Sequence, residues 1–134
     1  MTEASDPVVQ LDDVYRFFET EGERVAVLKG VSFELPRGSF TTIMGPSGSG
    51  KSTLLHLMAG LDVPDAGSIK IAGESISEAH DEDARATLRR KNIGFIFQFF
   101  NLLPDLSVGD NIVLPLLIAG DRPERYQDLS LIHI

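Results

Sequence analysis

The sequence predicts an α/β domain with a parallel core sheet and an antiparallel N-terminal sheet. In the first third of the chain, apolar residues alternate with polar ones, a period of two that is typical of strands. A glycine- and serine-rich loop then leads into an apolar stripe with helical spacing. Further along, strand-like and helix-like segments alternate, which favours parallel core strands.

The first third of the chain is expected to form antiparallel strands. The period-two pattern runs through residues 9–14 and again through residues 25–35. Residues 36–38 read as a turn, because Pro36 presets its φ angle. Residues 39–44 are then expected to form a short strand with apolar atoms on both faces.

The rest of the chain alternates helices and strands. Four apolar side chains after the loop have the spacing of one helical stripe: Leu54, Leu57, Met58 and Leu61. Residues 68–72 predict a strand. Residues 82–92 predict an exposed helix, with acidic residues first and basic ones last, as the helix dipole favours. Residues 93–98 predict a buried strand covered on both faces. Ser107 is expected to cap a further helix.

The composition excludes several classes of function. The 134 residues carry 12 basic and 20 acidic side chains, a formal net charge of −8, whereas nucleic-acid binding needs a basic surface. Because the chain has no cysteine, disulfides and cysteine zinc sites are ruled out. No apolar run reaches the roughly 18 residues of a membrane helix, and no secretory pattern begins the chain. We therefore expect a cytoplasmic protein that binds no nucleic acid and does not insert into the membrane.

The strongest motif is a phosphate-binding loop at residues 45–53, which fits G-x-x-x-x-G-K-[ST]. Its glycines let successive backbone N–H groups point inward as an anion nest, and the helix that follows adds its positive end. Lys51 is expected to reach the β- and γ-phosphates, Ser52 to bind Mg²⁺, and Thr53 to bond the α-phosphate.

The full set of predicted phosphate-binding residues is Gly45, Ser47, Gly48, Ser49, Gly50, Lys51, Ser52 and Thr53. An ordinary glycine-rich turn is the alternative, which the flanking strand and helix disfavour.

With these residues the sequence resembles the nucleotide-binding domain of ABC transporters, a P-loop NTPase. The resemblance spans about residues 11–119 and rests on the runs 28–33, 45–55 and 93–98. Unlike small kinases and GTPases, the chain has 44 residues before the loop, and it lacks the N-K-x-D guanine motif. Residues 89–119 look most like the ATPases of lipoprotein-releasing and macrolide-export systems.

The resemblance implies an ATPase that uses ATP and Mg²⁺. It implies two partners, a transmembrane permease and a second copy of the ATPase that sandwiches ATP. The protein would then lie on the inner face of the cell membrane, held there peripherally by the permease. The substrate of the permease is not encoded in the ATPase.

Gln98 looks like the glutamine of the family's Q-loop, which contacts Mg²⁺ or the attacking water. The predicted fold allows the same role, since Gln98 follows a buried strand at its carboxyl end. A glutamine making only local hydrogen bonds is the alternative. The catalytic candidates are thus Lys51 and Gln98, and the metal ligands Ser52 and Gln98.

Phe18 stands where the family usually has the tyrosine that stacks on adenine. The change removes a hydroxyl and keeps the stacking face. Tyr15 and Phe17 leave the register open, and a core aromatic is the alternative. The apolar loop 99–103 either contacts the permease or packs under the helix that begins after Ser107.

Residues 1–128 are interpreted as the N-terminal part of an ABC ATP-binding domain, with Walker A and Q-loop present. The signature sequence, the Walker B strand and the switch histidine of the family do not occur in these 134 residues. Residues 129–134 match the translation of a sequencing adapter, so a non-native tail is expected; a genuine apolar tail is the alternative. Such a truncated chain would hold phosphate without hydrolysing ATP.

The leading functional hypothesis is the ATPase subunit of an exporter or lipoprotein-release complex. One alternative is a regulatory ABC-type ATPase of a cell-division complex that signals to wall enzymes. Another is a non-transport ABC protein of repair or translation, which the acidic charge of the chain disfavours.

Overall fold

The computed structural model describes residues 6–76 and 81–120, so the predicted tail at 129–134 lies outside the described part. The chain divides into two compact units, Met1–Asn92 and Ile93–Ile134. Each is described by itself below. Within the described residues, no helix has the length and apolar content needed to cross a membrane.

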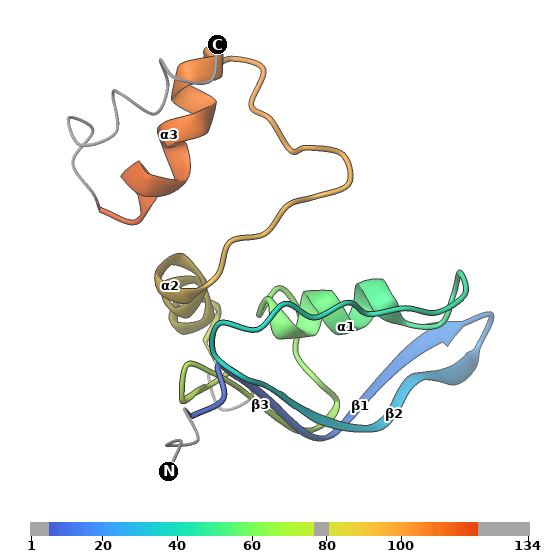
Figure 1. Ribbon diagram of the computed structural model, residues 1–134. Coiled ribbons are helices and arrows are strands. Elements are labelled where there is room, and N and C mark those ends of the chain that lie inside the picture. Colours follow the sequence, from blue (N-terminus) through green and yellow to red (C-terminus); the bar gives the residue numbers. More distant parts are fainter. Residues whose placement is uncertain (1–5, 77–80, 121–134) are drawn as a thin grey trace. The chain divides into compact units, whose positions relative to one another are not determined.

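The first unit is built on a sheet whose strands follow the order β2-β1-β3-β4 (Figure 1). The β1–β2 pair is antiparallel, as the sequence predicted for the N-terminal region. The strand after the first helix also pairs antiparallel, so the described strands contain no parallel pair of the predicted core. The strands are β1 (Val9–Thr20), β2 (Glu23–Leu35), β3 (Ala66–Ile71) and β4 (Glu74–Ser75). The two-residue strand β4 was not predicted, because so short a segment carries no periodic pattern.

β1 and β2 form a long hairpin closed by a two-residue turn. Glu21 and Gly22 occupy this turn with φ angles of 53° and 83°. Positive φ at both positions is the requirement of a type I′ turn, whose twist matches that of the strands.

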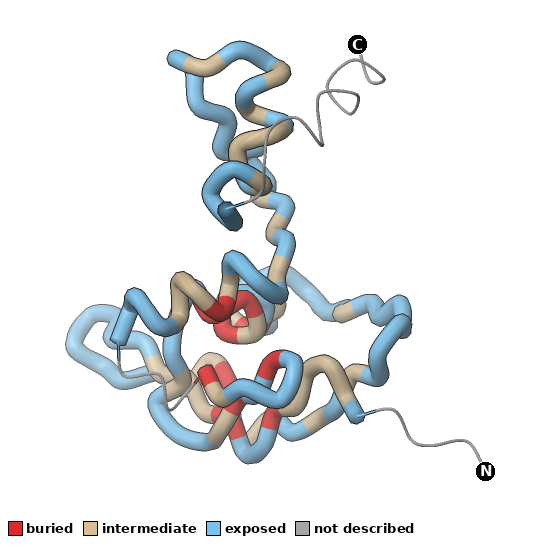
Figure 2. The backbone as a smooth tube through the Cα atoms, turned by 90° about the vertical axis from the view of Figure 1, so that its left-hand side faces the viewer, coloured by how far each residue is buried: buried red, intermediate tan, exposed pale blue. Residues whose placement is uncertain are grey.

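The core of the first unit lies between the sheet and α1 (Lys51–Met58), which packs on β3 (Figure 1). Its fully buried side chains are Val14, Leu57, Ile69 and Ile76. Each such side chain contributes roughly 1.5–3 kcal/mol relative to exposure. The helix ends at Met58, so the predicted stripe is shorter than expected and Leu61 lies beyond it, 42% exposed. All of the buried apolar side chains described belong to this unit (Figure 2).

One close approach in the first unit has no room for a side chain. Gly67 of β3 has a φ of +85°, and a Cβ built there would lie 2.3 Å from the backbone oxygen of Asp13. Asp13 itself has a φ of 48° and lies where the pairing of β1 shifts register. The β1–β3 contact therefore depends on glycine at position 67.

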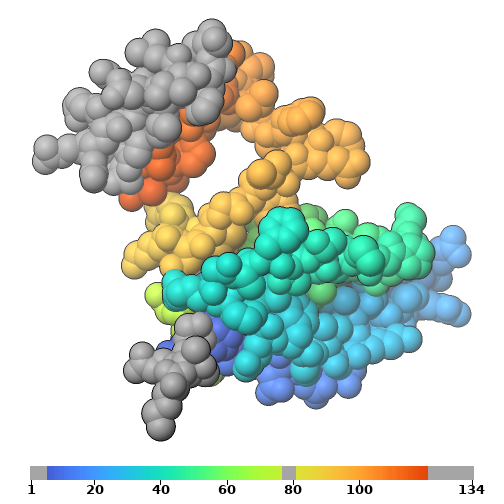
Figure 3. Space-filling model, in the orientation of Figure 1, coloured from blue at the N-terminus to red at the C-terminus, as the bar shows by residue number. Residues whose placement is uncertain are grey.

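The prediction of a strand at residues 39–44 is wrong. This segment is not paired in a sheet, and its Phe40 and Met44 are 97% and 85% exposed. It lies at the surface of the first unit (teal in Figure 3). A strand needs a neighbour that accepts and donates its ladder hydrogen bonds, and the described strands pair with one another instead.

The two later helices agree with the prediction. α2 (Glu82–Asn92) belongs to the first unit, and its Glu82 forms ion pairs with Arg85 and Arg89. Arg89 also donates a hydrogen bond of 2.6 Å to the backbone oxygen of Gly60, just beyond the end of α1. This hydrogen bond from the last turn of α2 helps to hold the helix against the rest of the first unit.

α3 (Val108–Ile118) lies in the second unit and begins as the capping pattern predicted. The Oγ of Ser107 accepts a hydrogen bond of 3.1 Å from the Asp110 N–H. The side chain of Asn111 closes the preceding loop, because it accepts from the Leu103 N–H at 2.8 Å and donates to the Leu103 oxygen at 3.0 Å.

The prediction of a buried strand at residues 93–98 is also wrong. Residues 93–97 do not form a strand, and Gln98 is exposed in a turn. Burial still alternates along the segment, since Phe95 and Phe97 are half-buried whereas Ile96 is 95% exposed. The ring centroids of the two phenylalanines are 4.6 Å apart. Here again the pattern was that of a strand, but the segment is not part of the described sheet.

Candidate functional site

The glycine-rich loop leads directly into the N-terminus of α1. Gly48 and Gly50 have φ angles of 79° and 93°, the left-handed region that favours glycine. Gly50 is the N-cap of α1, and no side chain caps that end of the helix. The first N–H groups of a helix lack acceptors within it, so this terminus is available to an anion.

Glycine is favoured at position 50 for a second reason, the limited space beside strand β2. A Cβ there would lie 3.1 Å from Cγ1 of Val27 and 3.2 Å from the Val27 backbone oxygen. The loop therefore rests closely against strand β2 at this position, and a side chain there would press on Val27. This packing holds the start of α1 against the sheet.

The ammonium group of Lys51 lies within the curve of the loop. Its Nζ donates hydrogen bonds to the backbone oxygens of Gly45 at 2.7 Å and Pro46 at 2.8 Å. The Oγ of Ser49 lies 3.4 Å away. One positive charge thus stands beside the N–H groups that the loop and helix present, which is the donor arrangement that phosphate oxygens need.

A pocket of about 360 Å³, called the hollow below, lies between the phosphate-binding loop and strand β1. Its lining consists of Phe18, Val27, Ser47, Gly48, Gly50, Lys51, Ser52 and Thr53. Phe18 comes from a distant part of the sequence, and its side chain is 41% exposed. The structure therefore brings the predicted stacking aromatic and six predicted phosphate-binding residues into one hollow. Gly45 and Ser49 belong to the loop and contact Lys51.

The neighbouring aromatic residues lie elsewhere. Tyr15 and Phe17 stack on each other with centroids 6.3 Å apart, and the guanidinium of Arg24 lies 4.3 Å from the Phe17 ring. Neither residue lines the hollow. Because successive side chains of a strand point to opposite faces, Phe18 is presented to the loop and Phe17 is not. The geometry favours Phe18 among the three candidates, and its role stays a prediction.

An arginine that sequence reasoning missed lies against Phe18. The Cζ of Arg16 is 5.0 Å from the centroid of the Phe18 ring. Its Nε and Nη2 donate to the carboxylate of Asp62 at 2.9 and 3.0 Å, and its Nη1 donates to Asp65 at 3.0 Å. No spacing in the sequence indicates these pairs, since 46 and 49 residues separate the partners.

Asp65 is held by more than Arg16. The Phe17 N–H donates to its Oδ2 at 2.8 Å, and Arg24 lies 3.9 Å from its Oδ1. The pKa of Asp65 is lowered from its ordinary value, chiefly by this backbone hydrogen bond and further by Arg16 and Arg24. The carboxylate form is therefore stabilised by the fold.

Asp65→Asn is expected to lower the free energy of unfolding by about 1 kcal/mol near pH 7, through lost hydrogen bonds to a charged group. A lowered folded pKa gives stability that is present above the unfolded pKa and lost as the pH falls through the folded one. The difference between wild type and variant should thus be constant at neutral pH and shrink below about pH 4. Urea unfolding at several pH values measures it, with Asp6→Asn as control. A difference that grows with acidity would contradict the assignment.

Gln98 belongs to the second unit, where its side chain is exposed in a turn. Lys51, Ser52 and Phe18 belong to the first unit. Its predicted contact with Mg²⁺ or water stays a prediction.

Of the two predicted Mg²⁺ ligands, Ser52 belongs to the loop. Within residues 6–76 and 81–120, no group of three or more His, Cys, Asp or Glu side chains could hold a metal ion. The hydroxyl of Ser52 lines the hollow. A Mg²⁺ ion there would take its other oxygen ligands from phosphates and water, which is its usual habit.

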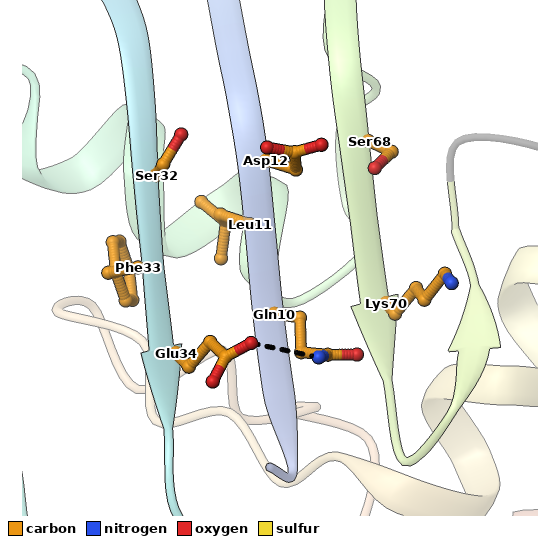
Figure 4. A pocket seen from close by; sticks show the side chains of 8 residues that line it. All are labelled: Gln10, Leu11, Asp12, Ser32, Phe33, Glu34, Ser68 and Lys70. Carbon is orange, nitrogen blue, oxygen red and sulfur yellow. Dashed lines mark hydrogen bonds between the residues drawn. The ribbon is translucent and has the colours of Figure 1, made fainter.

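A larger hollow of about 460 Å³ lies over strands β1, β2 and β3 (Figure 4). Asp12 and Glu34 line it together with a single cation, Lys70, and Gln10 donates a hydrogen bond of 3.0 Å to Glu34. Two carboxylates against one ammonium group repel a triphosphate. Of the two hollows, the smaller one at the loop is therefore the better candidate for a nucleotide, and this stays a prediction.

The chain resembles known ATP-binding proteins in sequence and in structure. The family model described as ABC transporter matches residues 28–133. The chain is 46% identical over 116 residues to the lipoprotein-releasing system ATP-binding protein LolD of Maricaulis maris, covering 87% of this chain and 50% of the relative. It is 49% identical over 115 residues to the macrolide export ATP-binding/permease protein MacB 1 of Aeromonas hydrophila, covering 86% of this chain and 18% of the relative.

Among solved structures, a dimeric ATP-binding cassette in a post-hydrolysis state, bound to ADP and Pi, superposes with a TM-score of 0.84 at 36% identity. The match covers 92% of this chain and 54% of that one. The chain spans about half the length of the LolD relatives that it matches.

Proposed function

The chain belongs to the ABC transporter family, and on that premise we propose that it supplies the part that binds ATP and Mg²⁺ in the ATP-hydrolysing subunit of an exporter or lipoprotein-release complex. The observation that carries the proposal is the hollow in which an aromatic ring and a phosphate-binding loop meet. A base and a triphosphate need these two surfaces side by side.

Each part of the hollow has a distinct task in this proposal. The loop N–H groups and the N-terminus of α1 bind the phosphate oxygens. Lys51 neutralises charge on the β- and γ-phosphates, and Thr53 bonds the α-phosphate. Ser52 contributes one ligand to Mg²⁺, which when bound draws negative charge from the phosphate oxygens. Phe18 stacks on the base.

Gln98 is proposed to orient the attacking water or to bind Mg²⁺ through its neutral amide. Support for this role comes from the exposure of the side chain in a turn and from the resemblance of residues 93–98 to the family's Q-loop. Lys51 and Gln98 are thus the proposed catalytic residues.

The proposed partners are a transmembrane permease and a second copy of the ATPase. The relatives include ATP-binding/permease proteins, and the related solved cassettes are dimers. In the second unit, Phe99 and Phe100 are 82% and 78% exposed and are proposed to contact the permease. Leu102 and Leu103 of the same loop line a hollow with Val108 and Ile112 of α3. The permease would hold the protein at the inner face of the membrane.

Phe18→Ala is expected to weaken binding of Mg²⁺ and ATP about tenfold, because stacking on an aromatic ring is worth roughly 1–3 kcal/mol per base. Tyr15→Ala, which removes a ring outside the hollow, should leave the affinity unchanged. Isothermal titration calorimetry of the wild type and both variants measures this. If the wild-type protein does not bind ATP, the proposed function is wrong; if Tyr15→Ala alone weakens binding, the aromatic residue is misassigned.

A further inference from the structure

We propose that Arg16 is a positioning residue for the nucleotide base, acting through Phe18; this inference rests on the proposed function. Its guanidinium lies over the Phe18 ring, 5.0 Å from the centroid. Arg16 itself does not line the hollow at the phosphate loop, whereas Phe18 does. One face of the ring is thus covered by a cation, which leaves the other face for stacking on a base.

The guanidinium that covers this face of the ring is held by three hydrogen bonds to Asp62 and Asp65, here called the fork. Arg16 pairs with Asp62 through two of its nitrogens and with Asp65 through a third, all at 2.9–3.0 Å. The side chains of the three residues are only 20–29% exposed. Such multidentate pairs fix orientation as well as energy, so the guanidinium plane and the ring beneath it are held in one arrangement.

The partner carboxylates belong to the turn that follows α1. In this turn the Asp65 N–H donates to the Tyr15 oxygen at 2.9 Å, and the Asp65 carboxylate accepts from the Phe17 N–H at 2.8 Å. The turn is therefore tied to β1 on both sides of Arg16. A shift of the turn would carry Arg16 with it.

This arrangement relates the two ends of the nucleotide site. α1 begins at Lys51 beside the phosphate loop, and the chain reaches Asp62 four residues after the helix ends at Met58. The N-terminus of the helix thus serves the phosphates, and the segment beyond its C-terminus holds Arg16 and through it Phe18. The helix and the short segment after it thus connect the phosphate end of the site to the base end.

The role can be tested with two ligands, ATP and inorganic tripolyphosphate, each with Mg²⁺. Arg16→Gln is expected to lower the affinity for ATP about fivefold, the loss expected for a partly desolvated cation over a ring. The affinity for tripolyphosphate, which has no base, should not change. Arg24→Gln is the matched control, since Arg24 lies over Phe17 and forms only a longer contact of 3.9 Å with Asp65; it should change neither affinity.

Two conservative variants keep the test decisive if Arg16→Gln fails to fold. Arg16→Lys keeps the charge without the fork, and Asp62→Asn weakens the fork without touching Arg16. Both should lose affinity for ATP alone, by less than Arg16→Gln.

Equal losses for ATP and tripolyphosphate would show a merely structural role and overturn the inference. Unchanged affinity for ATP in the Arg16 variants would also overturn it, while leaving the proposed function intact. A wild-type protein that binds neither ligand would instead overturn the proposed function itself.

Discussion

Lys51→Ala is expected to abolish measurable binding of ATP, with a loss of affinity of about a hundredfold or more. The ammonium group stands inside the phosphate loop, bonded to the oxygens of Gly45 and Pro46. Charge-assisted hydrogen bonds contribute roughly 1.5–3 kcal/mol each, and a lysine can form more than one to a triphosphate. Isothermal titration calorimetry with Mg²⁺ and ATP measures the loss.

The loss should come from binding and not from unfolding. The bonds that Lys51 makes in the loop are exposed, so the midpoint of thermal unfolding should change little. Lys70→Ala is the matched control, because it removes an ammonium group from the other hollow. Unchanged affinity for ATP in Lys51→Ala would remove the basis of the proposed site.

Gly67→Ala is expected to destabilise the protein by roughly 2–4 kcal/mol, through a backbone clash and left-handed strain together. The added Cβ would meet the Asp13 oxygen at 2.3 Å and the Asp12 oxygen at 2.6 Å. Neither contact can be relieved by turning a side chain, so the β1–β3 pairing has to move.

Gly22→Ala separates the two causes of that loss. Gly22 has nearly the same φ, +83°, but a Cβ there would meet nothing within 4 Å. The Gly22→Ala variant should therefore lower the free energy of unfolding only by its conformational strain, about 1–2 kcal/mol. Unfolding in urea compares the two variants. Equal losses would show that the close approach at Gly67 relaxes freely.

The parts of the fold that sequence reasoning predicted correctly are those with local causes. The period-two pattern of the hairpin, the charge order of Glu82–Asn92 and the Ser107 cap each act within a few residues. The segments 39–44 and 93–98 have equally good strand patterns, yet neither forms a strand in the structure. A ladder requires a second segment, and a pattern within one segment does not reveal whether its partner is there.

The residues of the candidate site differ in the same way, because some follow from a local pattern in the sequence and others do not. The phosphate loop could be predicted because its spacing is contiguous and its chemistry local. Phe18 required the resemblance to a family, since three aromatic residues crowd that part of β1. The fork from Arg16 to Asp62 and Asp65 could not be predicted, because opposite charges 46 and 49 residues apart become partners only once β1 and the turn after α1 meet.

The unpaired segment 39–44 also bears on how molecules of this chain meet one another. Backbone without a ladder neighbour, flanked by the exposed side chains of Phe40 and Met44, is a template onto which a strand of another chain can add. The net charge of −8 opposes such encounters through mutual repulsion. Because salt screens that repulsion over about 10 Å at 0.1 M, the colloidal behaviour of the chain depends on ionic strength as well as on concentration.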